Sequence, residues 1–158
     1  MVVHLIAVGK VKNAALRDAC EGYSQRVRHY LKLDVREVRD GGRADRDAES
    51  ARKLEGEALL RAVPNGAVIV AVTRAGRATS SRELAGQLEQ WRQEGRDVAF
   101  LVGGAHGLAA TVLERAQRRL SLSSMTFPHE VARLILLEQL YRACTISRGE
   151  PYHKGADR

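Results

Sequence analysis

The sequence is poor in cysteine and has no long run of apolar residues. Its 158 residues include two cysteines, Cys20 and Cys144, which form no C-x-x-C pair and no metal-ligand cluster with the five histidines. We therefore expect two buried thiols in a reducing cytoplasm rather than a disulfide, and no bound metal. The longest apolar runs, such as residues 134–137, are far shorter than the ~20 residues that a membrane span needs.

The amino terminus also lacks the features of a signal peptide. The segment MVVHLIAVGK has no positively charged leading region and no small-residue cleavage site, so it is interpreted as the first strand of a cytoplasmic protein. The His129-Glu130 pair is not followed by x-x-His, which excludes the helix of a zinc protease.

The composition is that of an ordinary globular protein with a basic balance. Hydrophobic residues make up 44% of the chain and charged residues 28%, and the length predicts a single domain over residues 1–158. The 26 Lys and Arg against 19 Asp and Glu give a net charge of +7. A basic balance on a small domain favours a polyanionic partner, although many proteins are basic without one.

The hydrophobic pattern alternates between strands and helices along the whole chain. Such alternation predicts a three-layer α/β sandwich with a sheet rich in parallel pairs. Ligands of these sheets bind beyond the carboxyl ends of the strands, which draws attention to the loops 73–78, 103–107 and 123–129. The strands are expected at residues 2–8, 33–38, 67–72, 98–102 and 120–123, and the helices at 14–31, 45–63, 80–94, 108–119 and 129–146.

A glycine-rich loop follows the expected strand 98–102. Its residues Gly103, Gly104 and Gly107 allow a sharp turn and let a ligand approach the main chain, while the next helix offers free N–H groups. No Gly-Lys-Ser or Gly-Lys-Thr follows, so the loop is no P-loop, and it departs from G-x-G-x-x-G. The alternative is a plain strand-to-helix turn.

The loop 122–129 combines hydroxyl residues, Met125 and Phe127 with Pro128. Proline is tolerated at the start of a helix because its missing N–H would have no partner there. Apolar side chains beside exposed main-chain groups suit an adenine ring, which needs cover for its faces and polar groups for its edge. The alternative is an ordinary connection between a strand and a helix.

Charged residues on the last helix and in the tail are candidates for catalysis. Glu138 and Arg142 lie one helical turn apart, so they form either a surface ion pair worth about 0.2–0.5 kcal/mol or a site in which Arg142 binds a phosphate or a base carbonyl. The tail carries Tyr152, which can stack on a base, and His153, which can transfer a proton. The alternative for the tail is a frayed terminus.

Taken together, these segments resemble one known family over essentially the whole chain. The resemblance rests on LVGG at 101–104 with Gly-Leu at 107–108, LSLSSMTFPH at 120–129, EQLYRA at 138–143 and PYH at 151–153. The chain is similar to the large-subunit ribosomal RNA (pseudouridine-N3) methyltransferases, minimal members of the SPOUT methyltransferases. The resemblance implies a C-terminal trefoil knot, which general experience with folds argues against.

The resemblance also implies a cofactor, a partner and an assembly. S-adenosylmethionine would lie bent in the knotted loops, and the enzyme would be a homodimer with its active site at the subunit interface. The substrate would be a pseudouridine of the large-subunit ribosomal RNA, presented by the assembled ribosome. By position, the residues expected to hold the cofactor are Val72, Gly103, Leu122, Ser123, Ser124, Met125, Thr126 and Phe127.

Catalysis is expected to depend mainly on positioning, because the methyl group of a sulfonium is already activated. We expect Arg142 to stabilise the charge that develops on the base, and Tyr152 and His153 to place the base and accept its proton. No residue is identified as a general base. Two alternatives are a non-catalytic ribosome-associated RNA-binding protein and a nucleotide-binding regulator that uses the Gly103 loop for phosphate.

Overall fold

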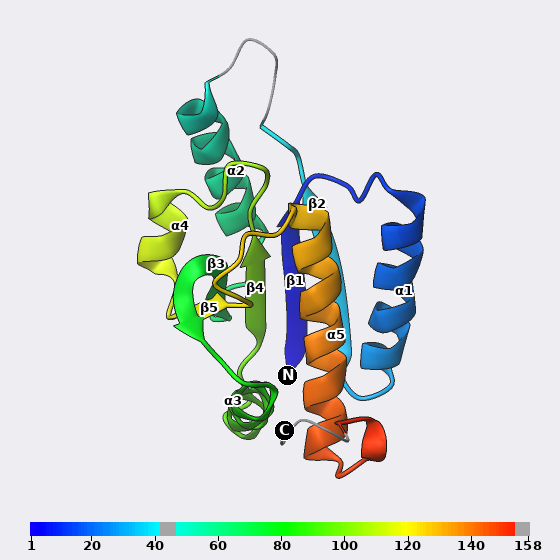
Figure 1. Cartoon of the computed structure of the whole chain (residues 1–158). Helices are drawn as coiled ribbons and strands as arrows, with labels where there is room; N and C mark the ends of the chain where they lie inside the picture. Colours follow the sequence, from blue (N-terminus) through cyan, green and yellow to red (C-terminus); the bar gives the residue numbers. More distant parts are fainter. Residues whose placement is uncertain (42–46, 154–158) are drawn as a thin grey trace.

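The computed structural model describes residues 1–41 and 47–153, without the side chain of His153. Its centre is a five-stranded sheet in the order β2-β1-β4-β3-β5, in which every pairing is parallel (Figure 1). Because the strands run in the same direction, their carboxyl ends all meet at one edge. The strands are β1 (Val2–Val8), β2 (Lys32–Val38), β3 (Val68–Ala78), β4 (Val98–Val102) and β5 (Arg118–Ser121).

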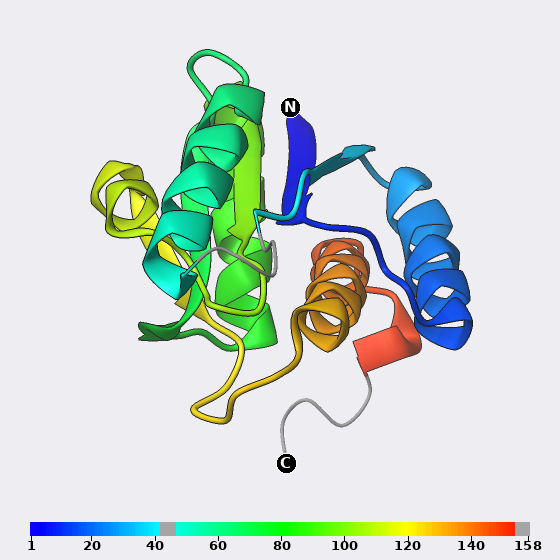
Figure 2. The same cartoon turned by 90° about the horizontal axis from the view of Figure 1, so that it is seen from above.

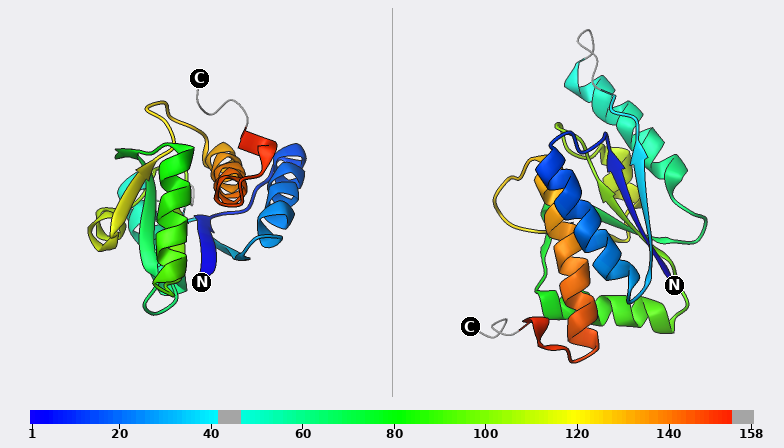
Figure 3. Two further views of the ribbon diagram at one scale, coloured as in Figure 1. Left: turned by 90° about the horizontal axis from the view of Figure 1, so that it is seen from below. Right: turned by 90° about the vertical axis from the view of Figure 1, so that its right-hand side faces the viewer.

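Helices cover both faces of the sheet and produce three layers (Figure 2). One face carries α1, α3 and α5, with α5 packed between the other two (Figure 3). The opposite face carries α2 and α4. The helices are α1 (Ala14–Arg28), α2 (Ala48–Ala62), α3 (Ser81–Gln93), α4 (Ala110–Arg115) and α5 (His129–Ser147), followed by a 3-10 turn, η1 (Pro151–His153).

Two apolar clusters hold these layers together. Alternate residues of β1 point to opposite faces, so Leu5 packs under α1, α3 and α5 while Ile6 packs under α2 and α4. The central strand β4 is buried at all five positions, as expected of a parallel strand covered on both faces. The architecture therefore confirms the predicted three-layer α/β sandwich; the trefoil knot stays a prediction.

Local capping explains where several helices begin. Ser80 accepts the N–H of Glu83, whose carboxylate accepts the N–H of Ser80, so the expected capped start of α3 is confirmed. Asp47 caps α2 by accepting from Ser50, so this helix begins at Ala48. The predicted start of α2 at Asp45 lies outside the described residues.

Three predicted elements have boundaries that are wrong by a few residues. Helix α1 ends at Arg28 rather than at residue 31, and α4 spans only Ala110–Arg115 rather than 108–119. Strand β5 begins at Arg118 instead of residue 120, because pairing with Val70 and Ala71 recruits the two arginines that precede its apolar residues. Pairing between strands distant in sequence thus overrides the local pattern.

The predicted loop 73–78 is instead part of β3, which contains a large bulge. Val72 and Arg77 both pair with Leu120 of β5, so the four residues between them have no place in the ladder. Gly76 closes this bulge: a Cβ atom there would lie 2.7 Å from the carbonyl carbon of Leu120. The bulge lets β3 pair with β5 again after leaving the sheet and carries its middle residues toward the carboxyl edge.

Within the described residues, no helix is long and apolar enough to cross a membrane.

Candidate functional site

A cavity of about 730 Å³ lies at the carboxyl ends of β4 and β5, beside the bulge of β3. Its volume is within the range of about 300–1,000 Å³ typical of ligand pockets, and its place is where open parallel sheets bind ligands. Three segments form its walls: the β3 bulge, the glycine loop after β4, and the loop that leads from β5 to α5. The last of these crosses from the β5 side to α5 in Figure 2.

The glycine loop forms a turn that closes on itself. The N–H of Gly107 donates to the carbonyl oxygen of Gly104 at 3.1 Å, and Gly107 has a φ of 77°. A Cβ atom at Gly103 would lie 2.6 Å from the carbonyl carbon of Gly107, a separation that packed atoms do not allow. Glycine is therefore required at both positions, and main chain rather than side chains faces the cavity at Gly103.

A buried carboxylate supports this loop from behind. Glu55 of α2 is only 3% exposed and accepts the N–H of Gly41 at 3.1 Å. A Cβ atom at Gly104 would lie 3.0 Å from Glu55 Oε2, so the loop packs directly on the carboxylate. Burial raises the pKa of Glu55, the hydrogen bond from Gly41 lowers it, and nearby Asp40 raises it further. The loop and α2 therefore form one packed unit.

Hydroxyl groups shape the loop between β5 and α5. Ser121 Oγ donates to the carbonyl oxygen of Ser123, whose own Oγ accepts the N–H of Met125 at 3.0 Å. These local bonds replace the strand ladder and turn the chain away from the sheet. Met125 is left 68% exposed beside the cavity, which makes it an apolar side chain available to cover a ligand.

The first turns of α5, which form another wall, are pinned to the loop after β1. Arg133 is 3% exposed; it pairs with Glu37 at 2.8 Å and donates to the carbonyl oxygens of Val8, at 2.6 Å, and Gly9. Glu130 accepts the N–H of Lys12 at 2.9 Å, and this contact lowers the pKa of Glu130. The helix start is thereby fixed relative to the sheet.

Seven of the eight residues expected to hold a cofactor line this cavity. The exception is Ser124, which lies in the same loop but does not line it. The seven are Val72, Gly103, Leu122, Ser123, Met125, Thr126 and Phe127.

Arg142 lies outside this cavity, in a neighbouring one of about 630 Å³. Its Nε and Nη2 donate to Glu138 Oε1 at 3.0 and 2.6 Å, so the ion pair, one of the two alternatives for this spacing, is present. The hydrogen bond to Glu138 raises the pKa of Arg142, so the guanidinium is permanently charged. It is 27% exposed and therefore accessible to a ligand.

Tyr152 is packed against the protein, so a frayed terminus does not describe this residue. Its ring centroid is 4.6 Å from that of Tyr141 and 4.9 Å from the Arg142 guanidinium carbon, and its hydroxyl donates to Glu138 Oε1 at 3.1 Å. Burial is the first of several causes that raise the pKa of Tyr152. His153 lies in the same 3-10 turn, but its side chain is outside the described part of the chain.

Sequence reasoning missed the polar residues of the β3 bulge. Thr73 and Arg74 line the cavity together with His106 of the glycine loop. The stretch 73–78 follows a buried strand, but nothing in its composition indicates that β3 pairs with β5 again beyond it. The only local signal is Gly76, a glycine inside an expected loop.

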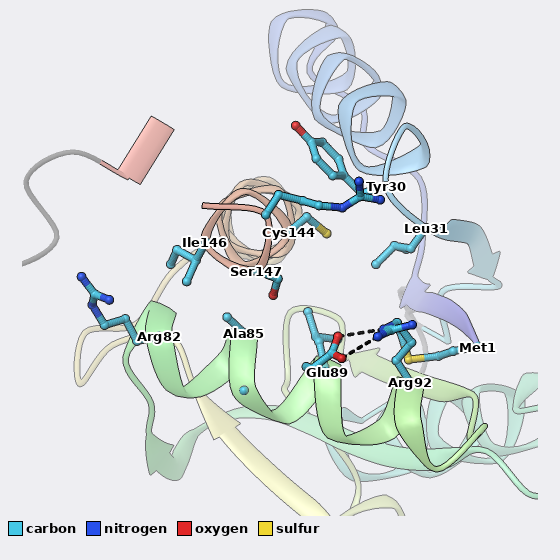
Figure 4. Close-up of a pocket in the computed structure, with 13 residues that line it drawn as sticks. Met1, Tyr30, Leu31, Arg82, Ala85, Glu89, Arg92, Cys144, Ile146 and Ser147 are labelled. Carbon is cyan, nitrogen blue, oxygen red and sulfur yellow. Dashed lines mark hydrogen bonds and ion pairs between the residues drawn. The ribbon is translucent and has the colours of Figure 1, made fainter. Parts of the chain in front are cut away.

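A further cavity of about 890 Å³ lies at the opposite end of the molecule, beside Met1 and between α3 and α5 (Figure 4). Its lining is mainly apolar, and at its rim Glu89 and Arg92 pair with each other at 2.6 Å. Cys144 lines it, and burial raises the pKa of this thiol to about 11, so it is a poor nucleophile. Within the described residues, no group of three or more His, Cys, Asp or Glu side chains is arranged to hold a metal.

Comparisons with known proteins identify the family of this chain. Residues 1–153 match the family described as "Predicted SPOUT methyltransferase". A protein of Gemmatimonas aurantiaca named "Ribosomal RNA large subunit methyltransferase H" is 47% identical over 154 residues, which cover 98% of this chain and 100% of that protein. A protein of the same name from Clostridium beijerinckii is 38% identical, over 98% of this chain and 100% of its own length.

Two solved structures share the fold. A probable methylase family protein from Haemophilus influenzae superposes with a TM-score of 0.55 at 11% identity, over 97% of this chain and 70% of its own. A probable methyltransferase from Bordetella pertussis gives 0.57 at 16% identity, over 90% of this chain and 93% of its own. The family match and the close relatives together establish that this chain belongs to the SPOUT methyltransferases.

Proposed function

We propose that this protein transfers a methyl group from S-adenosylmethionine to N3 of a pseudouridine in large-subunit ribosomal RNA, on the assembled ribosome. The observation that carries the proposal is the 47% identity, over 98% of this chain and 100% of the relative, to a protein named as a methyltransferase of large-subunit ribosomal RNA. The net charge of +7 agrees with an RNA partner. A purely RNA-binding role would leave the cavity at the strand ends without a purpose.

The residues around the cavity fit S-adenosylmethionine. Main-chain groups of the glycine loop, where a Cβ atom at Gly103 would collide with the backbone of Gly107, suit the polar edge of an adenine. The exposed thioether of Met125 and the ring of Phe127 suit its faces. When bound, S-adenosylmethionine would supply an activated methyl group from its sulfonium; the electron pair of the broken C–S bond would stay on sulfur, and the N3 proton would pass to the acceptor assigned below, His153. No metal is required for this chemistry.

Arg142 is the group that we assign to charge stabilisation. A base that loses its N3 proton during transfer becomes negative, and a guanidinium held rigidly by Glu138 stabilises that charge without reorganising. Tyr152 and His153 are assigned to placing the base, and His153 to accepting its proton. Tyr152 is tied to the same carboxylate as Arg142, so the two act as one unit.

We further propose that residues 1–158 form one domain, that the enzyme is a cytoplasmic homodimer, and that the subunit interface contributes to the site. In support of one domain, all five strands of the described chain belong to one sheet, and its five α-helices cover the two faces of that sheet. With no separate RNA-binding module among these elements, recognition depends on the protein surface and on the ribosome itself.

Methyl transfer from labelled S-adenosylmethionine tests the function. The substrates are assembled ribosomes, free large subunits and naked ribosomal RNA, all from a strain that lacks the gene. We expect label in large-subunit RNA, strongest with assembled ribosomes. No label on any of the three, with folded protein and measurable cofactor binding, would refute the ribosomal assignment.

Two variants test the assigned roles in the same assay. Arg142→Ala should bind the cofactor normally and lose about 100-fold or more in rate, as when a charge-stabilising group is removed. A chain truncated before Pro151 should also keep cofactor binding and lose transfer. Full activity of either variant would remove the corresponding role.

A further inference from the structure

A second cavity, of about 630 Å³, adjoins the cofactor cavity. Leu122 lines both of them, and so does one face of α5. His129 and Ala132 border the first cavity, and Ile135, Gln139 and Arg142 border the second. These residues are spaced three or four apart, so they form a single stripe along the helix. The two cavities therefore lie end to end along α5.

The wall opposite α5 comes from the segment that leads out of the β3 bulge into α3. Thr79, Ser80 and Ser81 line this side. The rest of the lining includes the apolar side chains Leu84 and Leu120. The cavity thus offers apolar surface for the faces of a planar ring and polar groups for its edge.

Three polar side chains that line this cavity, Ser81, Gln139 and Arg142, are linked by hydrogen bonds through Glu138. Ser81 Oγ donates to Gln139 Oε1 at 2.6 Å, and Gln139 Nε2 donates to Glu138 Oε2 at 2.6 Å. Glu138 Oε1 accepts from Arg142. Arg142 uses Nε and Nη2 for that contact, and among the described residues no acceptor binds its Nη1. A cationic donor is therefore held rigidly at the cavity with N–H groups to spare.

We propose that this second cavity receives the target base, a uracil-type ring with an imide edge, while the first holds the methyl donor. A carbonyl oxygen beside N3 accepts from Arg142, and the hydroxyl groups of Thr79 and Ser81 and the amide of Gln139 meet the remaining polar edge. The base faces rest on Leu120 and Ile135. This assignment rests on the proposed function and adds the residues that select the base.

The charged and polar groups of this cavity favour a ligand with an imide edge. Arg142 is the group that a base carrying a developing negative charge requires. The hydroxyl and amide groups beside it serve as donors or acceptors, which suits an edge with both carbonyl and N–H groups. Leu122 lines both cavities, so N3 of the base and the methyl group of the donor would meet beside this side chain.

Chemical blocking of the cavity tests the proposal. Thr79→Cys places a thiol in its wall, and Thr111→Cys places one on exposed α4, on the other face of the sheet. Cys20 and Cys144 are buried, and the unmodified parent is treated in parallel. After labelling with a bulky maleimide, Thr79→Cys should lose transfer to ribosomes by about tenfold or more and keep its cofactor affinity. Labelled Thr111→Cys should behave as the parent does.

A second variant keeps the test independent of labelling. Gln139→Ala removes a hydrogen bond worth about 0.5–1.5 kcal/mol, so kcat/KM for ribosomes should fall about 2- to 10-fold while the Kd of S-adenosylmethionine stays constant. Unchanged transfer by both labelled Thr79→Cys and Gln139→Ala would overturn the base site and leave the function intact. Loss of cofactor affinity in both would also overturn it, by assigning the cavity to the methyl donor.

A third outcome separates this inference from the function that it builds on. Absence of transfer by the unlabelled parent to every ribosomal substrate would refute the proposed function, and the base site would fall with it. Transfer by the parent with the expected losses in the two variants supports both.

Discussion

Replacement of Gly76 by alanine should damage both the stability of the protein and its cofactor cavity. The added Cβ atom would lie 2.7 Å from the carbonyl carbon of Leu120 and 2.8 Å from the carbonyl carbon and oxygen of Arg119. Carbon atoms in contact prefer about 3.5–4.0 Å. All three atoms belong to the backbone of β5, so no side chain can move away to make room. The two strands must instead separate by about 0.8 Å or more.

The expected cost follows from overpacking in a closely packed region. Such insertions destabilise proteins by about 1–3 kcal/mol. For a protein of this size, 1 kcal/mol lowers Tm by roughly 2–4 °C, so Gly76→Ala should lower Tm by about 2–12 °C. Because Gly76 closes the bulge that carries Thr73 and Arg74 into the cavity wall, the affinity for S-adenosylmethionine should fall as well.

Gly22→Ala is the matched control for this substitution. Gly22 lies within α1, where a Cβ atom would meet nothing within 4 Å. Alanine in a helix interior is better than glycine by roughly 0.5–1 kcal/mol, so Tm should rise by about 1–4 °C. Thermal unfolding and calorimetric cofactor binding of the two variants measure the contrast. A Tm for Gly76→Ala equal to or above that of the parent would refute the account of the bulge.

Three more predictions concern buried charges and thiols. Arg133→Met should cost about 1–3 kcal/mol in urea unfolding, because buried carbonyl oxygens lose their donor while half-exposed Glu37 becomes hydrated; an unchanged midpoint would contradict this. Burial raises the pKa of Glu55, so the contribution of its protonated carboxyl to the stability of the fold is lost as pH rises through the folded-state pKa. The free energy of unfolding of Glu55→Gln should therefore increase relative to that of the parent between pH 4 and pH 8. A difference between the two free energies that stays constant over this range would contradict the raised pKa. Cys20 and Cys144, whose pKa values burial raises, should react with iodoacetamide only after unfolding, as mass spectrometry can measure.

The fold class was accessible from the sequence because the apolar pattern of each element is strong. Buried runs such as Val98–Val102 are typical of parallel strands with helices on both faces. The predicted helix ends were less accurate where packing decides them. Helix α4 shows this clearly: its start and end depend on the turn at Gly107 and on the early beginning of β5, neither of which is visible in the local pattern.

The cofactor residues were predicted through the family resemblance, and most of them line one cavity. The position of the Arg142 side chain relative to that cavity could not be predicted from the sequence. The side chain lies in a neighbouring cavity, and its distance from the first depends on how α5 crosses the sheet. Likewise, nothing local indicates that Tyr152 packs on Tyr141, because that contact requires the chain to turn back after α5.

Local sequence is enough to specify the alternation of strands and helices, the glycine turn at 103–107 and the capped start of α3, since each depends on neighbouring residues and on short-range sterics. Long-range packing specifies the strand order, the bulge in β3 and the alignment of two cavities along α5. These features arise from contacts between segments far apart in the chain. Their energies depend on the packing of whole layers, which no local pattern records.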